Sequence, residues 1–286
     1  MLLVSTVLGA ALLPPPRVVG ATSSGIELLV PVSLTLDVAI FEANIEQQAD
    51  LVATALDTAT PAGSAAEDPY GVVIWPAAQV VAAELVRVLE GYRQCRVLEL
   101  GAGTGLCSIA AAASGAVTLA TDYRDEPLAL LRYSAQRTAQ RLGDATDLPM
   151  LKTQRFDVTS TSTPLPDIAG NGPLIVCAAD LLYLPSTSVA LAARCCEALR
   201  LPDVEAVLVG DLGRPGRAAF LEELVRLGVR KEMACFEAVP GWGAPAPRHE
   251  LISSRRTGGT GAEPEEVSVG LLVLSPADLQ DERDYC

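Results

Sequence analysis

The sequence VLELGAGTGL at residues 97–106 is the feature that most constrains the fold of this chain. A run of strand-forming residues leads directly into a turn with glycines at 101, 103 and 105, and an alanine-rich segment follows. Glycine tolerates positive φ and has no Cβ, so such a turn lets the main chain approach a ligand closely. A buried strand, a glycine turn and a helix in this order predict the ligand-binding corner of a doubly wound α/β sheet.

From Gly71 onward, on both sides of this turn, the sequence predicts helices that alternate with strands. Pro76 and Gly91 bracket one helix, because proline suits the first helical position and glycine the residue after the end. Further helices are predicted at 106–113, 186–199 and 217–228, and one that Asp125 caps and Gly143 ends. Strands are predicted at 96–100, 117–122, 149–156, 173–179, 204–211, 229–239 and 267–274.

Crossover helices between strands require a mostly parallel sheet. The last two predicted strands have no helix between them, so we expect them to pair as an antiparallel hairpin. The fold class is therefore α/β, a Rossmann-like doubly wound sheet that is mostly parallel with an antiparallel last strand.

Three parts are predicted along the 286 residues. Residues 1–24 form an extension, either disordered or a targeting segment, whose apolar run is too short to cross a membrane. Residues 25–69 form a strand appendage and a loop. Residues 70–286 form the main domain, with a Pro/Gly-rich insertion at 240–266. We expect a monomer in the cytoplasm, or in a mitochondrion or plastid if the extension is a targeting segment.

The cysteines and the histidine limit the chemistry of the chain. The seven cysteines include no C-x-x-C pair, and His249 is the only histidine. This pattern favours a reducing compartment and predicts neither a disulfide framework nor a metal site.

Three residues around the glycine turn restrict its ligand. A dinucleotide fingerprint would need glycine at position 106, where the chain has Leu106, and no lysine follows the turn as in a phosphate-binding P-loop. Glu99 precedes the first glycine, and Asp122 ends the next strand, where its carboxylate can accept hydrogen bonds from the vicinal hydroxyls of a ribose. An adenosine-bearing ligand without a pyrophosphate fits this pattern.

These residues resemble the seven-β-strand, class I S-adenosylmethionine-dependent methyltransferases. VLELGAGTGL is similar to their first motif and LATD at 119–122 to their second. PYGVVIWPAAQVVAAELV at 69–86 and AADLLY at 178–183 resemble the protein-lysine methyltransferase subgroup with a D-x-x-Y motif. VGDLGRPG at 209–216 is similar to a segment of relatives that methylate the β-subunit of electron-transfer flavoprotein.

The resemblance implies a role for each matching residue, with S-adenosylmethionine as cofactor and a protein lysine as acceptor. It assigns cofactor binding to Trp75, Glu99, Gly101, Ala102, Gly103, Gly105, Asp122, Asp157, Val158 and Ala179. It places Asp180 and Tyr183 at the substrate amine as the catalytic pair. The chain departs from the family pattern at Ser134, where many members have Asn, and at Leu212, where they have Pro.

Several alternatives remain open at this level. Trp75 and Tyr183 also suit packing, and Asp157 and Asp180 also suit turns after strands. A small-molecule or nucleic-acid methyltransferase and a non-catalytic protein-binding module share the predicted fold. The net charge of −14 disfavours nucleic acid as a partner, and no segment predicts attachment to a membrane.

Overall fold

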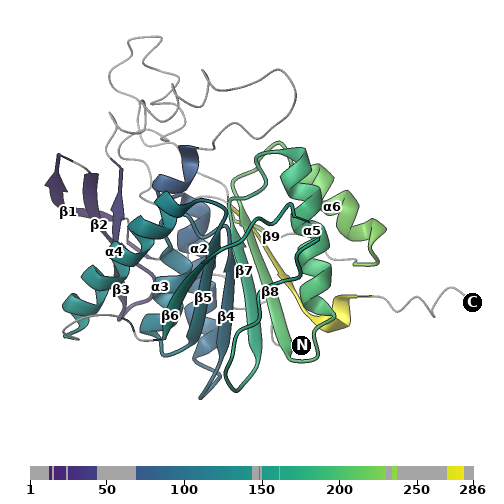
Figure 1. Cartoon of the computed structure of the whole chain (residues 1–286), viewed down its shortest axis with the longest axis horizontal. Coiled ribbons are helices and arrows are strands. Elements are labelled where there is room, and N and C mark those ends of the chain that lie inside the picture. The colour runs from purple at the N-terminus through teal and green to yellow at the C-terminus, as the bar shows by residue number, and fades with distance from the viewer. Residues whose placement is uncertain are drawn as a thin grey trace, which may run out of the picture.

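A central β-sheet organises the computed structural model, which describes residues 13–43 except Pro15 and Ser24, 69–143, 148, 150–160, 162–229, 234–236 and 269–279. Within these residues the sheet has seven strands in the order β6-β5-β4-β7-β8-β10-β9 (Figure 1). The strands are β4 (Arg96–Leu100), β5 (Val117–Asp122), β6 (Leu151–Arg155), β7 (Leu174–Ala179), β8 (Val204–Asp211), β9 (Ala234–Phe236) and β10 (Val269–Leu274).

The directions of the strands confirm the predicted fold class. β4 to β8 run parallel to one another, whereas β10 runs antiparallel to both β8 and β9. The chain leaves β4 for β5 on one side and returns to β7 on the other side. The order of the strands therefore reverses at β4, which is the place where an open α/β sheet binds its ligands.

Helices cover both faces of the sheet. They are α2 (Pro76–Leu89), α3 (Leu106–Ala113), α4 (Asp125–Leu142), α5 (Pro185–Leu199) and α6 (Arg217–Arg226). α2, α3 and α4 lie on one face and α5 and α6 on the other (Figure 1). Since successive residues of a strand point to opposite faces, Val97 and Cys177 join the core under the first group of helices, while Leu98 and Val176 join the second core.

The ends of the helices follow the local sequence, with one correction. Pro76 occupies the first turn of α2, and Gly143 ends α4 in the left-handed conformation at φ +90°. Asp125, which we predicted as the cap of α4, is its first helical residue, and Arg124 is the N-cap without a side-chain cap. Asp125 still suits this position, because acidic side chains in the first turn interact favourably with the helix dipole.

The N-terminal part contributes a separate antiparallel sheet with the order β1-β2-β3 among the described residues. The predicted strand pair at 25–42 is present as β2 (Gly25–Pro31) and β3 (Asp37–Glu42). β1 (Arg17–Thr22) adds a strand within the stretch that we expected to be an extension.

The edge of β3 lies against α4. The hydroxyl of Ser134 accepts a hydrogen bond from the Phe41 N–H at 2.9 Å, and that of Thr138 accepts one from the Ala39 N–H at 3.0 Å. The helix therefore satisfies strand donors that would otherwise be buried without partners. The 240–266 insertion lies outside the described residues, and the division into domains stays a prediction.

The described residues also contain two short 3-10 helices, η2 (Pro69–Val72) and η3 (Pro276–Asp278). Among the described residues, no helix is both long enough and apolar enough to cross a membrane.

Candidate active site

A cavity of about 390 Å³ opens at the carboxyl ends of β4, β5 and β7. Segments from six parts of the chain line it, and they include eleven of the twelve residues singled out from the sequence. These eleven are Trp75, Glu99, Gly101, Ala102, Gly103, Asp122, Asp157, Val158, Ala179, Asp180 and Tyr183. The fold therefore gathers eleven of the residues predicted from the sequence in one place.

Gly105 is the exception among the twelve. It is the N-cap of α3 at φ +86°, and a Cβ at this position would lie 2.2 Å from Cγ of Leu131 in α4. Glycine is required here because α3 and α4 pack closely, so the geometry gives Gly105 a structural task beneath the cavity.

The other two glycines of the turn face the cavity directly. Gly101 and Gly103 have φ values of +63° and +52°, which side chains other than glycine rarely adopt. A Cβ on Gly101 would lie 2.5 Å from Cδ2 of Leu181, and one on Gly103 would lie 3.2 Å from the carbonyl oxygen of Gly71. The turn therefore leaves its main chain exposed to whatever fills the cavity.

Asp122 connects the end of β5 to this turn. One carboxylate oxygen accepts a hydrogen bond from the Gly103 N–H at 3.0 Å, and the other accepts one from the Arg124 N–H at 3.1 Å. Each carboxylate oxygen has a second lone pair. Asp122 can consequently hold the turn and accept hydrogen bonds from a ligand in the cavity at the same time.

Glu99 is a buried carboxyl group beneath the turn. Its Oε2 accepts hydrogen bonds from the N–H and the hydroxyl of Ser108, in the first turn of α3. Burial nevertheless raises the pKa of Glu99 to about 7, and the nearby carboxylate of Asp122 adds to the rise. Glu99 can therefore change its charge near neutral pH.

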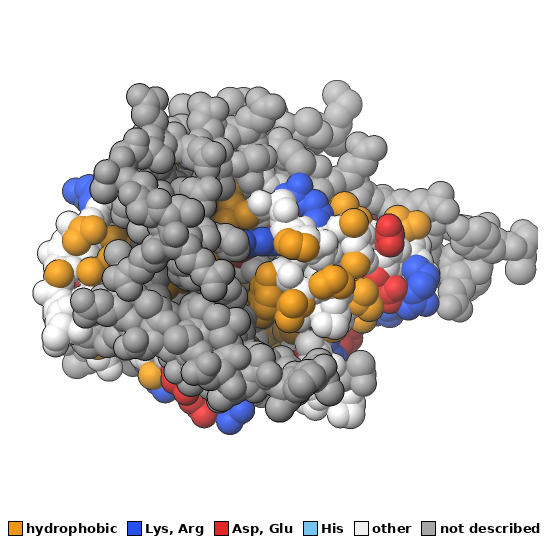
Figure 2. All heavy atoms as spheres, turned by 90° about the horizontal axis from the view of Figure 1, so that it is seen from above, with side chains coloured by type: hydrophobic (Ala, Val, Ile, Leu, Met, Phe, Trp, Pro, Cys, Tyr) orange, Lys and Arg blue, Asp and Glu red, His pale blue; other side chains and the backbone are white. Residues whose placement is uncertain are grey.

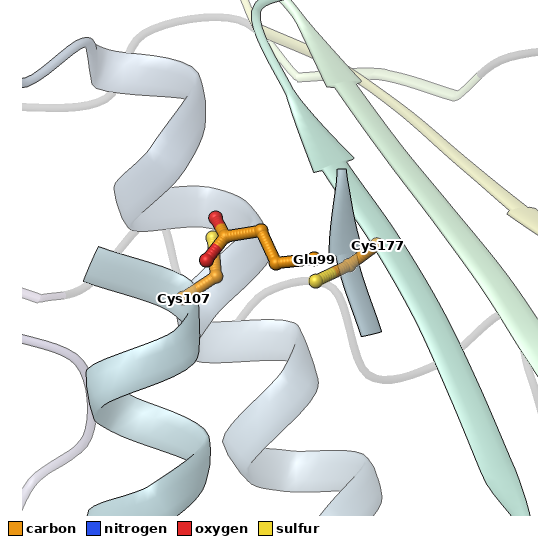
Figure 3. A group of neighbouring side chains, drawn as sticks. All are labelled: Glu99, Cys107 and Cys177. Carbon is orange, nitrogen blue, oxygen red and sulfur yellow. The ribbon is translucent and has the colours of Figure 1, made fainter. Parts of the chain in front are cut away.

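Two thiols lie beside Glu99 (Figure 3). The donor atoms of Glu99, Cys107 and Cys177 lie within 4.8 Å of one another. Hydrogen bonding with Cys177 and burial keep the pKa of Cys107 well above its ordinary value, which favours the neutral thiol over the thiolate that binds metals. That the protein uses no metal stays a prediction.

Asp157 and Val158 form a turn along the opposite wall. Oδ1 of Asp157 accepts hydrogen bonds from the N–H of Thr159 at 2.8 Å and from its hydroxyl at 2.7 Å. Arg194 of α5 donates to the carbonyl of Val158 at 3.2 Å. Asp157 thus stabilises the turn, as the structural alternative from the sequence predicted. It also lines the cavity.

Asp180 lies at the other end of the cavity, directly after β7. Its φ of +60° is in the left-handed region, and it is the one non-glycine residue with positive φ in the described part of the chain. Its carboxylate forms a bidentate ion pair with Arg214, with 2.9 Å between Nε and Oδ1 and a second contact between Nη2 and Oδ2. Burial still raises the pKa of Asp180.

Arg214 also connects Asp180 to Trp75. Its guanidinium carbon lies 4.7 Å from the centroid of the Trp75 ring, within the range of a cation–π interaction. Arg214 was not among the residues predicted from the sequence, although VGDLGRPG contains it. The available signal was an arginine three positions after Asp211, which ends a strand next to the one that Asp180 follows.

Comparison with known proteins gives the following matches. A family model described as lysine methyltransferase matches residues 63–210. Protein-lysine methyltransferase METTL21E of Bos taurus is 37% identical over 120 residues, which are 41% of this chain and 40% of that protein. Its Mus musculus counterpart is 34% identical over 119 residues, which are 41% of this chain and 47% of that protein. The match thus spans less than half of the length of these relatives.

Solved structures show a more distant likeness. TrmN from Thermus thermophilus has 17% identity and a TM-score of 0.42, with 68% of this chain and 48% of that chain covered. A TehB-like SAM-dependent methyltransferase from Corynebacterium glutamicum has 14% identity and a TM-score of 0.39, with 78% and 96% covered.

Proposed function

Since this chain belongs to the lysine methyltransferase family, whose model matches residues 63–210, we propose that it transfers a methyl group from S-adenosylmethionine to a lysine side chain of another protein. The observation that carries the proposal is the cavity in which Trp75, Asp122, Asp180 and Tyr183 meet. These residues come from three separate segments that the sequence motifs single out.

The cavity fits the cofactor in its donor half. The methionine part would lie on the main chain of Gly101, Ala102 and Gly103, where an added Cβ would meet Leu181 or Gly71. Asp122 would accept hydrogen bonds from the ribose, and Glu99 would offer its carboxylate beneath the turn. Asp157 and Val158 would border the adenine, while Trp75 and Ala179 would lie near the sulfur.

When bound, the cofactor would supply a methyl group on a positively charged sulfur, and transfer to the amine lone pair would break the C–S bond and leave its electron pair on sulfur. The residues of this chain have to position the amine and exclude water. A lysine amine has an ordinary pKa of about 10.4, so it must lose a proton before it can react. Asp180 and Tyr183 would orient this amine at the end of β7.

The rim of the cavity supports a protein acceptor. Hydrophobic side chains gather over the region of α5 on the face that contains the carboxyl ends of the strands (Figure 2). Leu184 lines the cavity and is 45% exposed, and Val189 of α5 is 40% exposed. Exposed apolar side chains beside a site are typical of surfaces that bind other proteins. We propose a monomer that acts on a protein, with neither nucleic acid nor a membrane as its partner.

Two experiments test the proposed function. Isothermal titration should show binding of S-adenosylhomocysteine, and Gly101→Arg should abolish it by filling the cavity. Incubation of a cell lysate with radiolabelled S-adenosylmethionine should then label the protein fraction, and mass spectrometry should locate the label on lysine. Absence of binding by the folded wild type would exclude the methyl donor, while label in RNA or in small molecules alone would exclude the protein acceptor.

A further inference from the structure

The loop between β8 and α6 fixes the main chain of Arg214 before its side chain reaches the cavity. Asp211 is fully buried, and its carboxylate accepts hydrogen bonds from the Gly213 N–H at 3.0 Å and the Arg214 N–H at 3.1 Å. Arg217 forms an ion pair with the same carboxylate. The loop is therefore held by a charge pair of its own, outside the lining of the cavity.

The side chain of Arg214 joins two walls of the cavity. It forms the bidentate pair with Asp180 and lies over the ring of Trp75. Arg214, Asp180 and Trp75 are far apart in the sequence. Only 1% of the Asp180 side chain and 16% of the Arg214 side chain are exposed. Two opposite charges held this close and this deeply offset each other strongly, because little water screens them.

We infer that Arg214 is a positioning residue that cancels the charge of Asp180, so that the acceptor end of the cavity takes up the lysine as a neutral amine. An unpaired carboxylate at this depth would attract the ammonium form and hold its proton. The paired carboxylate still has lone pairs that can accept a hydrogen bond from the N–H of a neutral amine. The proton of the ammonium passes to water before the amine enters, which leaves the nitrogen lone pair available.

Other charged or titratable groups near this end do not replace Arg214. Asp211 and Arg217 form an ion pair outside the lining of the cavity, and Tyr183 lines the cavity without carrying a cation. The remaining such groups on the described walls belong to the donor half and are Glu99, Asp122, Tyr123, Arg124 and Asp157.

This inference rests on the proposed function, and the pH dependence of methyl transfer into lysate proteins tests it. In Arg214→Gln the carboxylate of Asp180 is left without its cation. The pH of half-maximal transfer should therefore rise by about one unit or more, with about a tenfold loss at pH 7. Arg214→Lys keeps the charge and loses the planar fork, so its rate should fall while its midpoint stays near that of the wild type.

Three further variants separate charge from folding. The double variant Asp180→Asn/Arg214→Gln removes both charges and should return the midpoint toward the wild-type value, even if the rate is low. Arg217→Gln should lower the melting temperature without moving the midpoint. Arg226→Gln, at a site that is 67% exposed on α6, should leave both unchanged.

A second measurement needs no methyl transfer. In the presence of S-adenosylhomocysteine, thermal stabilisation by n-butylamine should increase with pH for the wild type and much less for Arg214→Gln. A uniform loss of rate in Arg214→Gln at every pH, or the same amine response in both proteins, would overturn the inference. A wild type that labels no protein would instead refute the proposed function.

Discussion

Gly101→Ala adds one carbon atom at the centre of the glycine turn and should damage both stability and cofactor binding. The new Cβ would lie 2.5 Å from Cδ2 and 2.6 Å from Cδ1 of Leu181, at a residue whose φ is +63°. Leu181 lines the cavity, so a shift of its side chain changes the space that is left for the cofactor.

The magnitude follows from two separate contributions. A left-handed backbone at a residue with a Cβ costs about 1–2 kcal/mol, and overlap with a packed side chain costs about 1–3 kcal/mol. Gly115→Ala isolates the first contribution, because Gly115 has a φ of +89° and no atom within 4 Å of the position of its Cβ. We therefore expect Gly101→Ala to lower the free energy of unfolding by about 2–5 kcal/mol and Gly115→Ala by about 1–2 kcal/mol.

Urea unfolding measures the two stabilities, and titration with S-adenosylhomocysteine below the unfolding transition measures affinity. Gly101→Ala should bind at least about tenfold more weakly, which corresponds to about 1.4 kcal/mol, while Gly115→Ala should bind like the wild type. Equal stability losses and equal affinities in the two variants would refute the assignment of the turn to the cofactor.

Four other changes have distinct expected results. Asp122→Asn should weaken binding of S-adenosylhomocysteine by about 1.5–3 kcal/mol in titration, since it removes charge-assisted hydrogen bonds; unchanged affinity would contradict a role at the ribose. Burial raises the pKa of Glu99 from 4.5 to about 7, so the folded state keeps a proton that the unfolded chain releases in this range, and stability should fall as the pH rises from about 4.5 to 7. Glu99→Gln should flatten that decline in urea unfolding at successive pH values, and an identical slope would contradict the burial argument. Ser134→Ala should lower the free energy of unfolding by about 1–3 kcal/mol, because the buried Phe41 N–H loses its acceptor, and a loss near zero would exclude this hydrogen bond. Dialysis against EDTA should leave the affinity for S-adenosylhomocysteine unchanged, whereas a loss restored by zinc would show that binding depends on a metal and would make Glu99 and the thiols beside it the candidate ligands.

The donor half of the cavity was predictable because its geometry is local. The turn follows β4 directly, and both residues with positive φ, Gly101 and Gly103, lie within three consecutive positions of the sequence. The position of Asp122 beside the turn could be predicted because it ends the next strand, and the apolar pattern and the crossover rule place that strand parallel to β4. The bounds predicted for β4, α3 and β5 agree with the structure for the same reason, and the family predicted from these motifs is confirmed by the family model.

The acceptor end of the cavity, around Asp180 and Arg214, was predictable only in part, because segments that are distant in the sequence meet there. The motif placed Asp180 at the end of β7, but the pair with Arg214 depends on the order in which β7 and β8 lie side by side and on the conformation of the loop after β8. The strand β1 was missed because RVVGAT has no alternation of apolar and polar residues, and five of its six residues are exposed. Its formation depends on pairing with β2.

The donor half of the cavity depends on main-chain geometry, whereas the acceptor end depends on paired side-chain charges. The two regions should therefore respond differently to substitution. In the donor half, Gly101 and Gly103 would bind the cofactor through the main chain, so almost any side chain there should remove the proposed site. In the acceptor half, charge is balanced by side chains on two loops, and the Asp211–Arg217 pair holds the main chain of the second loop independently of Arg214. Substitution of Arg214 can therefore change the protonation state of the accepted amine while the loop and the donor half stay in place. Substitutions of Arg214 should consequently affect the acceptor end of the cavity more than the main-chain turn that would hold the cofactor.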